Sequence, residues 1–249
     1  MFFNVISIVL LVIISMLVIQ AVIQVLNTPE HNQLGYSERI HVMENGVTYM
    51  EVRHTYMSLR RFRAVKVRAY FLAHGNFKNY SVSVLRNGQE IFFTEASPTS
   101  PGVDGTFTVN ITDGVADFII NTQVNRNEKI TVILRYFLTQ GALRFLDTGH
   151  MHRVWNPRGA DGVVDAFSIH VSFEGYVSQE ELRVIASGGE AGFLYEITSD
   201  GEVVFEAENV PFGEWAVFNV LFPVRLLPYA DIIEKELLGL LDLPANADS

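Results

Sequence analysis

The sequence predicts an all-β protein: an antiparallel β-sandwich, one large or two small, behind an N-terminal transmembrane helix and followed by a short C-terminal amphipathic helix. Three observations support this prediction. The first 26 residues carry no charged side chain. Apolar and polar residues alternate along much of the remaining chain, which is typical of strands with one buried face. Asn-Gly and Asp-Gly pairs separate these runs, and such pairs favour tight hairpin turns.

Residues 1–26 form an apolar run that favours an uncleaved membrane anchor. A helix of this length rises about 37 Å, which exceeds the roughly 30 Å hydrocarbon core of a bilayer. Residues 1–4 hold no Lys or Arg, and the run is longer than the apolar region of a secretory signal. Cleavage after Ala21 would place Ile19 where a small residue is preferred. A cleaved signal and a buried core helix remain the alternatives.

Few charges indicate how this segment is oriented in the membrane, because no Lys or Arg lies near either end. The α-amine and Glu30 favour an N-terminus inside the cell and a body outside it. We expect residues 27–35 to be a linker and residues 36–225 to be the β-sandwich ectodomain.

The alternation that predicts strands recurs along this body. In the segment from Thr106 to Thr112, one face is apolar and the other carries Thr and Asn. In the segment from Val163 to Phe173, apolar residues alternate with Ala, Ser and His. The expected hairpin turns are Asn45-Gly46, Asn87-Gly88, Asp113-Gly114 and Asp200-Gly201.

A basic cluster precedes and enters one of these alternating runs. It could face anionic lipid headgroups or a cell-wall polymer. From Val65 onward, however, basic and apolar residues alternate, which favours a solvated strand face. The cluster consists of Arg60, Arg61, Arg63, Lys66 and Arg68.

Residues 226–249 form the expected amphipathic tail. Between Tyr229 and Leu243, apolar residues recur at helical spacing opposite an acidic face. The resulting helix could pack on the sandwich or fray in solvent. Alternatively, it could dock a protein partner through residues 229–241 or lie on a membrane surface, although its net negative charge opposes contact with anionic lipid.

Composition limits the classes of chemistry. Aromatic residues make up 12% of the chain and charged residues 18%, which argues against disorder. The chain has no cysteine, which removes thiol catalysis, disulfides and cysteine-ligated zinc. Its net charge of −10 makes nucleic acid a poor partner.

The candidate metal ligands are His150 and His152. Alternate residues of a strand share a face, so both imidazoles could reach one metal ion, with a third ligand required. Asp147 or Asp161 could supply that ligand, and His170 could do so only if the strands are neighbours. Two ordinary surface histidines are the competing interpretation.

No other motif indicates catalysis. Asp161-Gly162 with Asp165 lacks the ligand pattern of an EF-hand, so a β-turn is favoured. The sequence holds no G-x-S-x-G elbow and no phosphate-binding glycine loop. We therefore predict no catalytic residues and no cofactor, and we expect the protein not to be an enzyme.

The order of several residues resembles the N-terminal β domain of a family of predicted membrane proteins, domain of unknown function 2207. Tyr136, Gly141, Asp147 and Trp155 stand in the family's order, and the closing strand ends on Phe-Pro at position 223. The hairpin at residues 45–46, leading into residue 51, matches the family's opening strands. The resemblance covers most of residues 36–223.

This resemblance implies an extracytoplasmic β domain without established catalytic residues, in which Trp155 and Asp147 define the fold. The chain departs from the family in two respects. Family members place their membrane helices after the β domain, and they commonly begin with a signal peptide.

Together these observations predict a single-pass membrane protein with an extracytoplasmic body that binds ligands or has a structural role at the cell surface. The expected partner of residues 1–26 is the lipid bilayer. The alternatives are a metal-dependent module or enzyme using His150 and His152, and an accessory subunit of a membrane complex.

Overall fold

The computed structural model describes residues 31–71, 76–97, 102–112, 114–155, 163–188, 192–211, 215–235 and 237. The expected anchor, residues 1–26, therefore lies outside the described residues. In the part of the chain that is described, no helix is long and apolar enough to cross a membrane.

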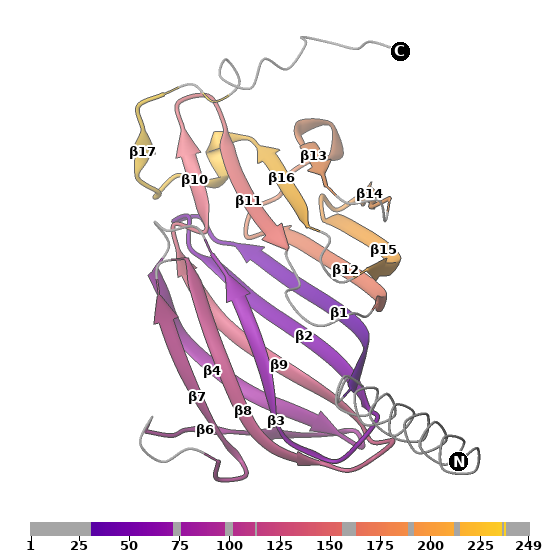
Figure 1. Ribbon diagram of the computed structural model, residues 1–249. Coiled ribbons are helices and arrows are strands. Elements are labelled where there is room, and N and C mark those ends of the chain that lie inside the picture. The colour runs from indigo at the N-terminus through magenta and orange to yellow at the C-terminus, as the bar shows by residue number, and fades with distance from the viewer. Residues whose placement is uncertain are drawn as a thin grey trace, which may run out of the picture. The chain divides into compact units, whose positions relative to one another are not determined.

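Strands make up most of the described body, as the alternation predicted, and they form three sheets (Figure 1). The large sheet has the order β14 (Leu194–Ile197), β15 (Val203–Pro211), β12 (Val163–Phe173), β1 (His31–Val42), β2 (Thr48–Ser58), β9 (Lys129–Thr139), β4 (Asn76–Arg86) and β5 (Gln89–Phe92).

The two smaller sheets have five and four strands. The five-stranded sheet has the order β13 (Arg183–Ser187), β16 (Ala216–Phe222), β11 (Gly149–Trp155), β10 (Ala142–Phe145) and β17 (Ile232–Ile233). The four-stranded sheet has the order β3 (Phe62–Tyr70), β8 (Val115–Val124), β7 (Thr106–Thr112) and β6 (Thr94–Glu95). The two short 3₁₀ helices of the described residues are η1 (Gln179–Glu181) and η2 (Val224–Leu226).

The alternating side chains occupy the faces that the sequence predicted. On β12, Phe167, Ile169 and Val171 are buried, while Ser168 and His170 lie half-exposed on the opposite face. Strand β3 follows the same rule, because its Val residues are buried and its basic residues are exposed.

The hairpin turns also agree with the sequence. Asn87 and Gly88 connect β4 to β5 with φ angles of 50° and 79°, the left-handed conformation that these residue types tolerate. Gly46 and Gly201 have similar φ angles of 79° and 78° in the β1–β2 and β14–β15 turns. The remaining expected turn is Asp113-Gly114, and its Asp113 lies outside the described residues.

The expectation of purely antiparallel pairing is wrong at the centre of the large sheet. Strand β1 pairs with β12 in parallel, from Gly35 opposite Ala166 to Val42 opposite Phe173. Two short pairs, β6 with β7 and β10 with β17, are parallel as well. The side-chain period of two is the same in both kinds of ladder, so alternation alone could not distinguish them.

Aromatic side chains join the large sheet to both smaller sheets. Phe77 of β4 lies 5.9 Å from Phe118 of β8, measured between ring centroids. At the other half of the large sheet, Phe167 of β12 lies 4.7 Å from Trp155 of β11 and 5.9 Å from Phe218 of β16. One buried cluster therefore includes residues of all three sheets.

The expected bounds of the body are too narrow at both ends. Residues His31–Gly35, expected in the linker, belong to β1 because their backbone pairs with β2. At the other end, Leu226 and Leu227 are buried in the core.

The expected C-terminal helix is wrong where the structure describes it. Ile232–Ile233 form β17, paired with Arg144 and Phe145 of β10. Leu146 donates its backbone N–H to the carbonyl of Lys235 at 3.1 Å. These sheet-type hydrogen bonds outweigh the helical spacing of the apolar residues, while residues 236 and 238–249 lie outside the described residues.

Candidate functional site

The two candidate metal ligands share one face of β11, as their spacing predicted. Met151, Arg153 and Trp155 point into the core and are buried, whereas His150 and His152 lie half-buried on the opposite face. The centroids of the two imidazole rings are 6.0 Å apart.

Asn219 of β16 brings the two histidines together. It lies opposite His152 in the antiparallel ladder between β11 and β16. Its Oδ1 atom lies 2.9 Å from His150 Nε2 and 2.8 Å from His152 Nδ1. Because an amide oxygen only accepts hydrogen bonds, this arrangement fits the tautomers that carry a proton on His150 Nε2 and on His152 Nδ1.

The surroundings of this pair are apolar. Phe145 and Leu221 are buried beside it, and the Phe145 ring centroid lies 6.3 Å from that of His150. Burial lowers the pKa of His150; the hydrogen bond to Asn219 opposes this shift, and His152 adds to it. His150 is therefore neutral at physiological pH, the form in which imidazole binds a metal ion.

The other candidate ligands do not join this pair. Asp147 lies between β10 and β11, where its carboxylate accepts the backbone N–H of Leu237 at 3.0 Å. His170 lies on the large sheet and contacts Glu202 at 3.2 Å. Asp161 lies outside the described residues. Within the described part of the chain, no three His, Asp or Glu side chains gather as a metal site.

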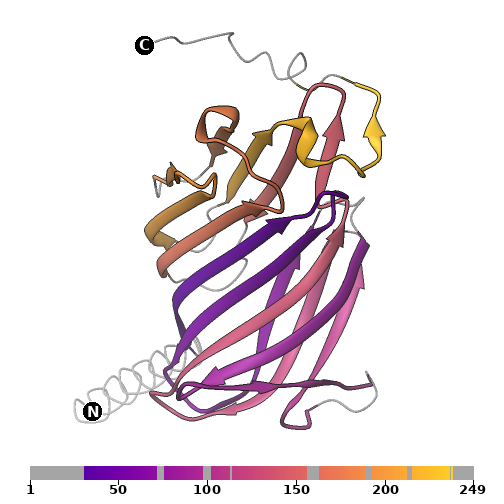
Figure 2. The same ribbon diagram turned by 180° about the vertical axis from the view of Figure 1, so that it is seen from behind.

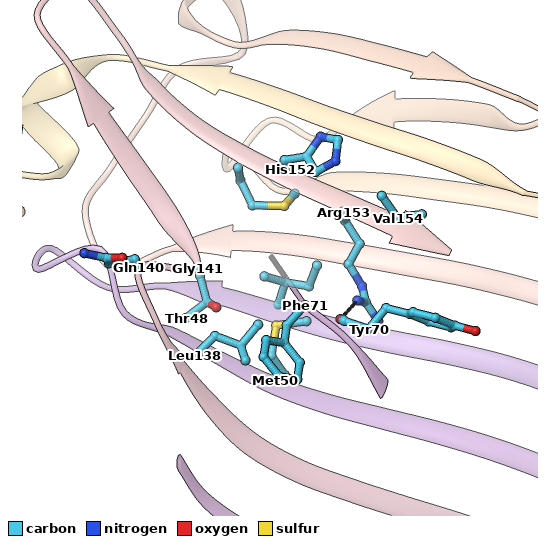
Figure 3. A pocket seen from close by; sticks show the side chains of 12 residues that line it. Thr48, Met50, Tyr70, Phe71, Leu138, Gln140, Gly141, His152, Arg153 and Val154 are labelled. Atoms are coloured by element: carbon cyan, nitrogen blue, oxygen red, sulfur yellow. Dashed lines mark hydrogen bonds between the residues drawn. The ribbon is translucent and has the colours of Figure 1, made fainter. Parts of the chain in front are cut away.

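A cavity of about 60 Å³ lies on the other side of β11, between the three sheets (Figure 3). Its walls are mainly apolar, with Met50 and Leu138 from the large sheet and Phe71 at the end of β3. The buried Thr48 Oγ1 atom at its wall has no hydrogen-bond partner among the described residues. This volume suits water rather than a substrate, since small-molecule sites usually measure about 300–1,000 Å³.

Arg153 at the edge of this cavity contacts all three sheets. Its Nε atom lies 2.8 Å from Glu38 Oε1 on β1. Its Nη1 group donates to the backbone oxygen of Tyr70 on β3 (Figure 3). Tyr36 donates its hydroxyl to Glu38 at 2.7 Å, so the buried carboxylate has two kinds of donor. This polar network fixes the sheets and is closed to solvent.

A larger hollow of about 640 Å³ lies on the outer face of the large sheet. Ser37 and Thr55 contribute hydroxyl groups from β1 and β2, and Glu206 and Glu208 contribute carboxylates from β15. Leu194 of β14, which is 75% exposed, adds an apolar wall. The hollow has the volume of a small-molecule site and an acidic wall.

Comparison with known proteins identifies no family. No family model and no curated protein matches the chain. Among solved structures, the chain is similar to a candidate protease from Parabacteroides distasonis, with 10% identity and a TM-score of 0.45 over 76% of this chain. A candidate nutrient-binding protein from Legionella pneumophila shows 8% identity and a TM-score of 0.45 over 77% of this chain.

An M1 zinc metallopeptidase from Deinococcus radiodurans shows 12% identity and a TM-score of 0.39. The match covers 40% of the length of the Parabacteroides protein, 67% of the Legionella protein and 43% of the Deinococcus protein. At these identities and TM-scores, none of them supports an activity for this chain.

The role of Asn219 was not predicted from the sequence because it depends on strand pairing. It is the one polar side chain in the apolar segment Ala216–Phe222, which was a signal that a polar partner had to be nearby. Only the register between β11 and β16 shows that the partners of Asn219 are the histidines of β11.

Proposed function

We propose that the protein is a membrane-anchored, extracytoplasmic β protein with a binding or structural role at the cell surface. The observation that carries this proposal is the uncharged run of residues 1–26. It is followed directly by a body with a buried core of its own. The hollow of about 640 Å³ on the large sheet supports a binding role.

The proposal includes the arrangement of the sheets. The aromatic contacts on both halves of the large sheet support a β-sandwich in which two smaller sheets cover one large sheet. The resemblance to domain of unknown function 2207 stays a prediction.

Fractionation of cells that express the full chain tests the anchored topology. We expect the intact chain in the membrane fraction after an alkaline carbonate wash. Protease added to intact cells should digest the body, and mass spectrometry should find an unprocessed N-terminus. Intact protein in the soluble fraction with its N-terminus unprocessed would contradict the proposal. A shortened, released form would instead identify a cleaved signal.

One observation favours a second candidate function, metal binding by the histidine pair. His150 Nε2 and His152 Nδ1 both lie within 3 Å of one oxygen atom, Asn219 Oδ1. Two imidazole nitrogens and an amide oxygen can form three corners of a zinc site once the proton of each neutral ring sits on the ring nitrogen that faces away from Asn219.

Metal analysis of the full-length protein after dialysis against Zn²⁺ tests this function. We expect one bound zinc ion in the unchanged chain and none in the His150→Ala/His152→Ala variant. The matched control is His170→Ala, which removes a half-exposed histidine from another sheet and should leave the zinc content unchanged. Equal zinc content in all three proteins would exclude the site.

A further inference from the structure

Two turns at one end of the described body carry a concentration of basic residues. One turn joins β2 to β3 and the other joins β8 to β9. Residues 58–63 and 124–129 together hold five basic residues against one acidic residue, a formal charge of +4 in a chain of net charge −10. We call these two segments the basic end; its basic residues are Arg60, Arg61, Arg63, Arg126 and Lys129.

Backbone hydrogen bonds hold the two turns against each other. Ser58 donates its N–H to the carbonyl of Glu128 at 3.0 Å, and its own carbonyl accepts the N–H of Asn127 at 2.8 Å. Asn127 adopts a φ angle of 61°, which closes the β8–β9 turn. The basic side chains therefore extend from one ordered surface rather than from two independent loops.

Within the described part of the chain, two acidic side chains beside the two turns already have partners. Glu128 Oε1 lies 2.9 Å from Arg86 Nε, and Oε2 accepts the backbone N–H of Asn125 at 2.7 Å. Asp104 accepts the backbone N–H of Gln123 at 2.9 Å.

The basic groups themselves are open to solvent. All five basic residues of the basic end are exposed. Among the residues that the structure describes, no carboxylate forms a salt bridge with Arg61, Arg63, Arg126 or Lys129.

The same end of the body holds the beginning of β1. His31, the first residue of β1, pairs with Ser58, so the basic turns adjoin the point where the body begins (Figures 1 and 2). Residues 27–30 alone separate β1 from the apolar run. The five steps from residue 26 to residue 31 reach at most about 17 Å when fully extended.

We propose that the basic end contacts the anionic phospholipid headgroups of the membrane in which residues 1–26 are anchored. This inference rests on the proposed anchor, and it adds a second contact between the chain and the bilayer. A tether this short keeps the body near the surface, where each Lys or Arg gains attraction from anionic lipid within a Debye length of about 8 Å. On the other side of β1, β12 and β15 carry the exposed acidic residues Asp165 and Glu208, which anionic lipid repels, so we expect the contact on the side that holds the two turns.

A single fluorescent label can report this contact, because the chain has no cysteine of its own. The full-length chain with Gln123→Cys carries a dye on an exposed residue beside the β8–β9 turn. It is reconstituted into vesicles that contain a trace of phospholipid with a quencher on its headgroup. The vesicles are phosphatidylcholine alone, or equal parts of phosphatidylcholine and phosphatidylglycerol.

We expect several-fold stronger quenching in the phosphatidylglycerol vesicles, and a return to the phosphatidylcholine value at high salt. The Arg61→Gln/Arg126→Gln/Lys129→Gln variant should lose this difference. The control Arg39→Gln/Lys78→Gln/Arg183→Gln removes three exposed basic residues elsewhere and should retain it. Equal quenching in both vesicles, or an unchanged difference in the first variant, would overturn the proposal.

Further arms separate the sources of negative charge. Inorganic phosphate should reduce the quenching no more than sodium chloride of equal ionic strength; a larger reduction would indicate a discrete phosphate site and overturn the lipid assignment. Binding of the labelled chain to soluble polyphosphate, together with equal quenching in both kinds of vesicle, would also overturn the lipid assignment. The basic end would then be a contact for an anionic polymer.

The carbonate wash distinguishes failure of this inference from failure of the anchor. If the chain leaves the membrane in the wash, the anchor fails, and the same labelled chain is sedimented with the two kinds of vesicle. Binding to phosphatidylglycerol vesicles alone would still support the basic end as a lipid contact, and absence of binding would overturn it.

Discussion

Arg153 of β11 and Glu38 of β1 form a buried ion pair, with Arg153 Nε 2.8 Å from Glu38 Oε1 and 3.0 Å from Oε2. Glu38 is fully buried and Arg153 is 7% exposed. Because Arg153 also donates to the backbone of Tyr70, this one side chain connects the large sheet with both smaller sheets.

Removal of one partner of this pair should strongly destabilise the protein. Arg153→Met leaves the Glu38 carboxylate buried without its counter-charge, and we expect a loss of about 3–5 kcal/mol in the free energy of unfolding. Urea denaturation measures this loss. The matched control is Arg68→Gln, which breaks the exposed pair with Asp117 at 2.9 Å and should cost at most about 1 kcal/mol. Equal losses in both variants would show that Arg153 does not hold the sheets together.

His54 should make the protein less stable in mild acid. Burial, together with the charge of Arg153, lowers the pKa of His54 to about 3 from an ordinary value of 6.5. Below pH 6.5, His54 binds a proton in the unfolded chain but not in the folded chain. The free energy of unfolding therefore falls as the pH drops towards 3. From pH 7 to pH 5 this residue should cost about 2 kcal/mol.

The variant His54→Phe tests whether His54 causes this loss of stability in acid. Phenylalanine keeps a ring beside Tyr36, whose ring centroid lies 5.1 Å from that of His54, but it cannot take up a proton. Unfolding free energies at pH 7 and pH 5 should differ less in this variant than in the unchanged protein. The same difference in both would assign the acid sensitivity to other groups.

Asn219 should control the charge of His150. Asn219→Asp places a carboxylate at the 2.9 Å position next to His150 Nε2, where an opposite charge favours the protonated ring. The pKa of His150 should rise by about 1–3 units, and NMR titration of its ring protons measures this. Asn219→Ser, which adds no charge, is the control. A pKa that stays the same in the Asp variant would show that the two side chains are not in contact.

Two glycines should differ in their tolerance of alanine. Both Gly88 and Gly201 have left-handed φ angles, 79° and 78°, so either substitution costs about 1–2 kcal/mol of backbone strain. At Gly201 a Cβ atom would also collide with the carbonyl oxygen of Val177, whereas at Gly88 it would meet nothing within 4 Å. Thermal unfolding should therefore show a larger loss for Gly201→Ala. Equal losses would mean that the Val177 backbone moves aside without cost.

Local features of the fold were predictable from the sequence, and long-range pairings were not. The faces of β3 and β12 followed from alternation, and the Asn87-Gly88 turn followed from the φ angles that these residues tolerate. The parallel pairing of β1 with β12 joins positions 131 residues apart in the chain, and no local pattern encodes it. For the same reason the helical spacing around residue 232 was misleading, since β17 depends on a partner in β10.

The candidate site was predicted in part. The shared face of His150 and His152 followed from their spacing on a strand. Asn219 required the register between β11 and β16, and the roles suggested for Asp147 and His170 failed because each side chain contacts another residue.

The central place of β1 also sets an order of events during synthesis. β1 is the first strand of the body, yet its parallel partner β12 is translated more than a hundred residues later. Until then one edge of β1 has no native neighbour, and unpaired strand edges promote aggregation of nascent chains. The large sheet can therefore close only after most of the chain has left the ribosome. Because loop closure over such a separation is slow, the pairing of β1 with β12 should be among the last steps of folding.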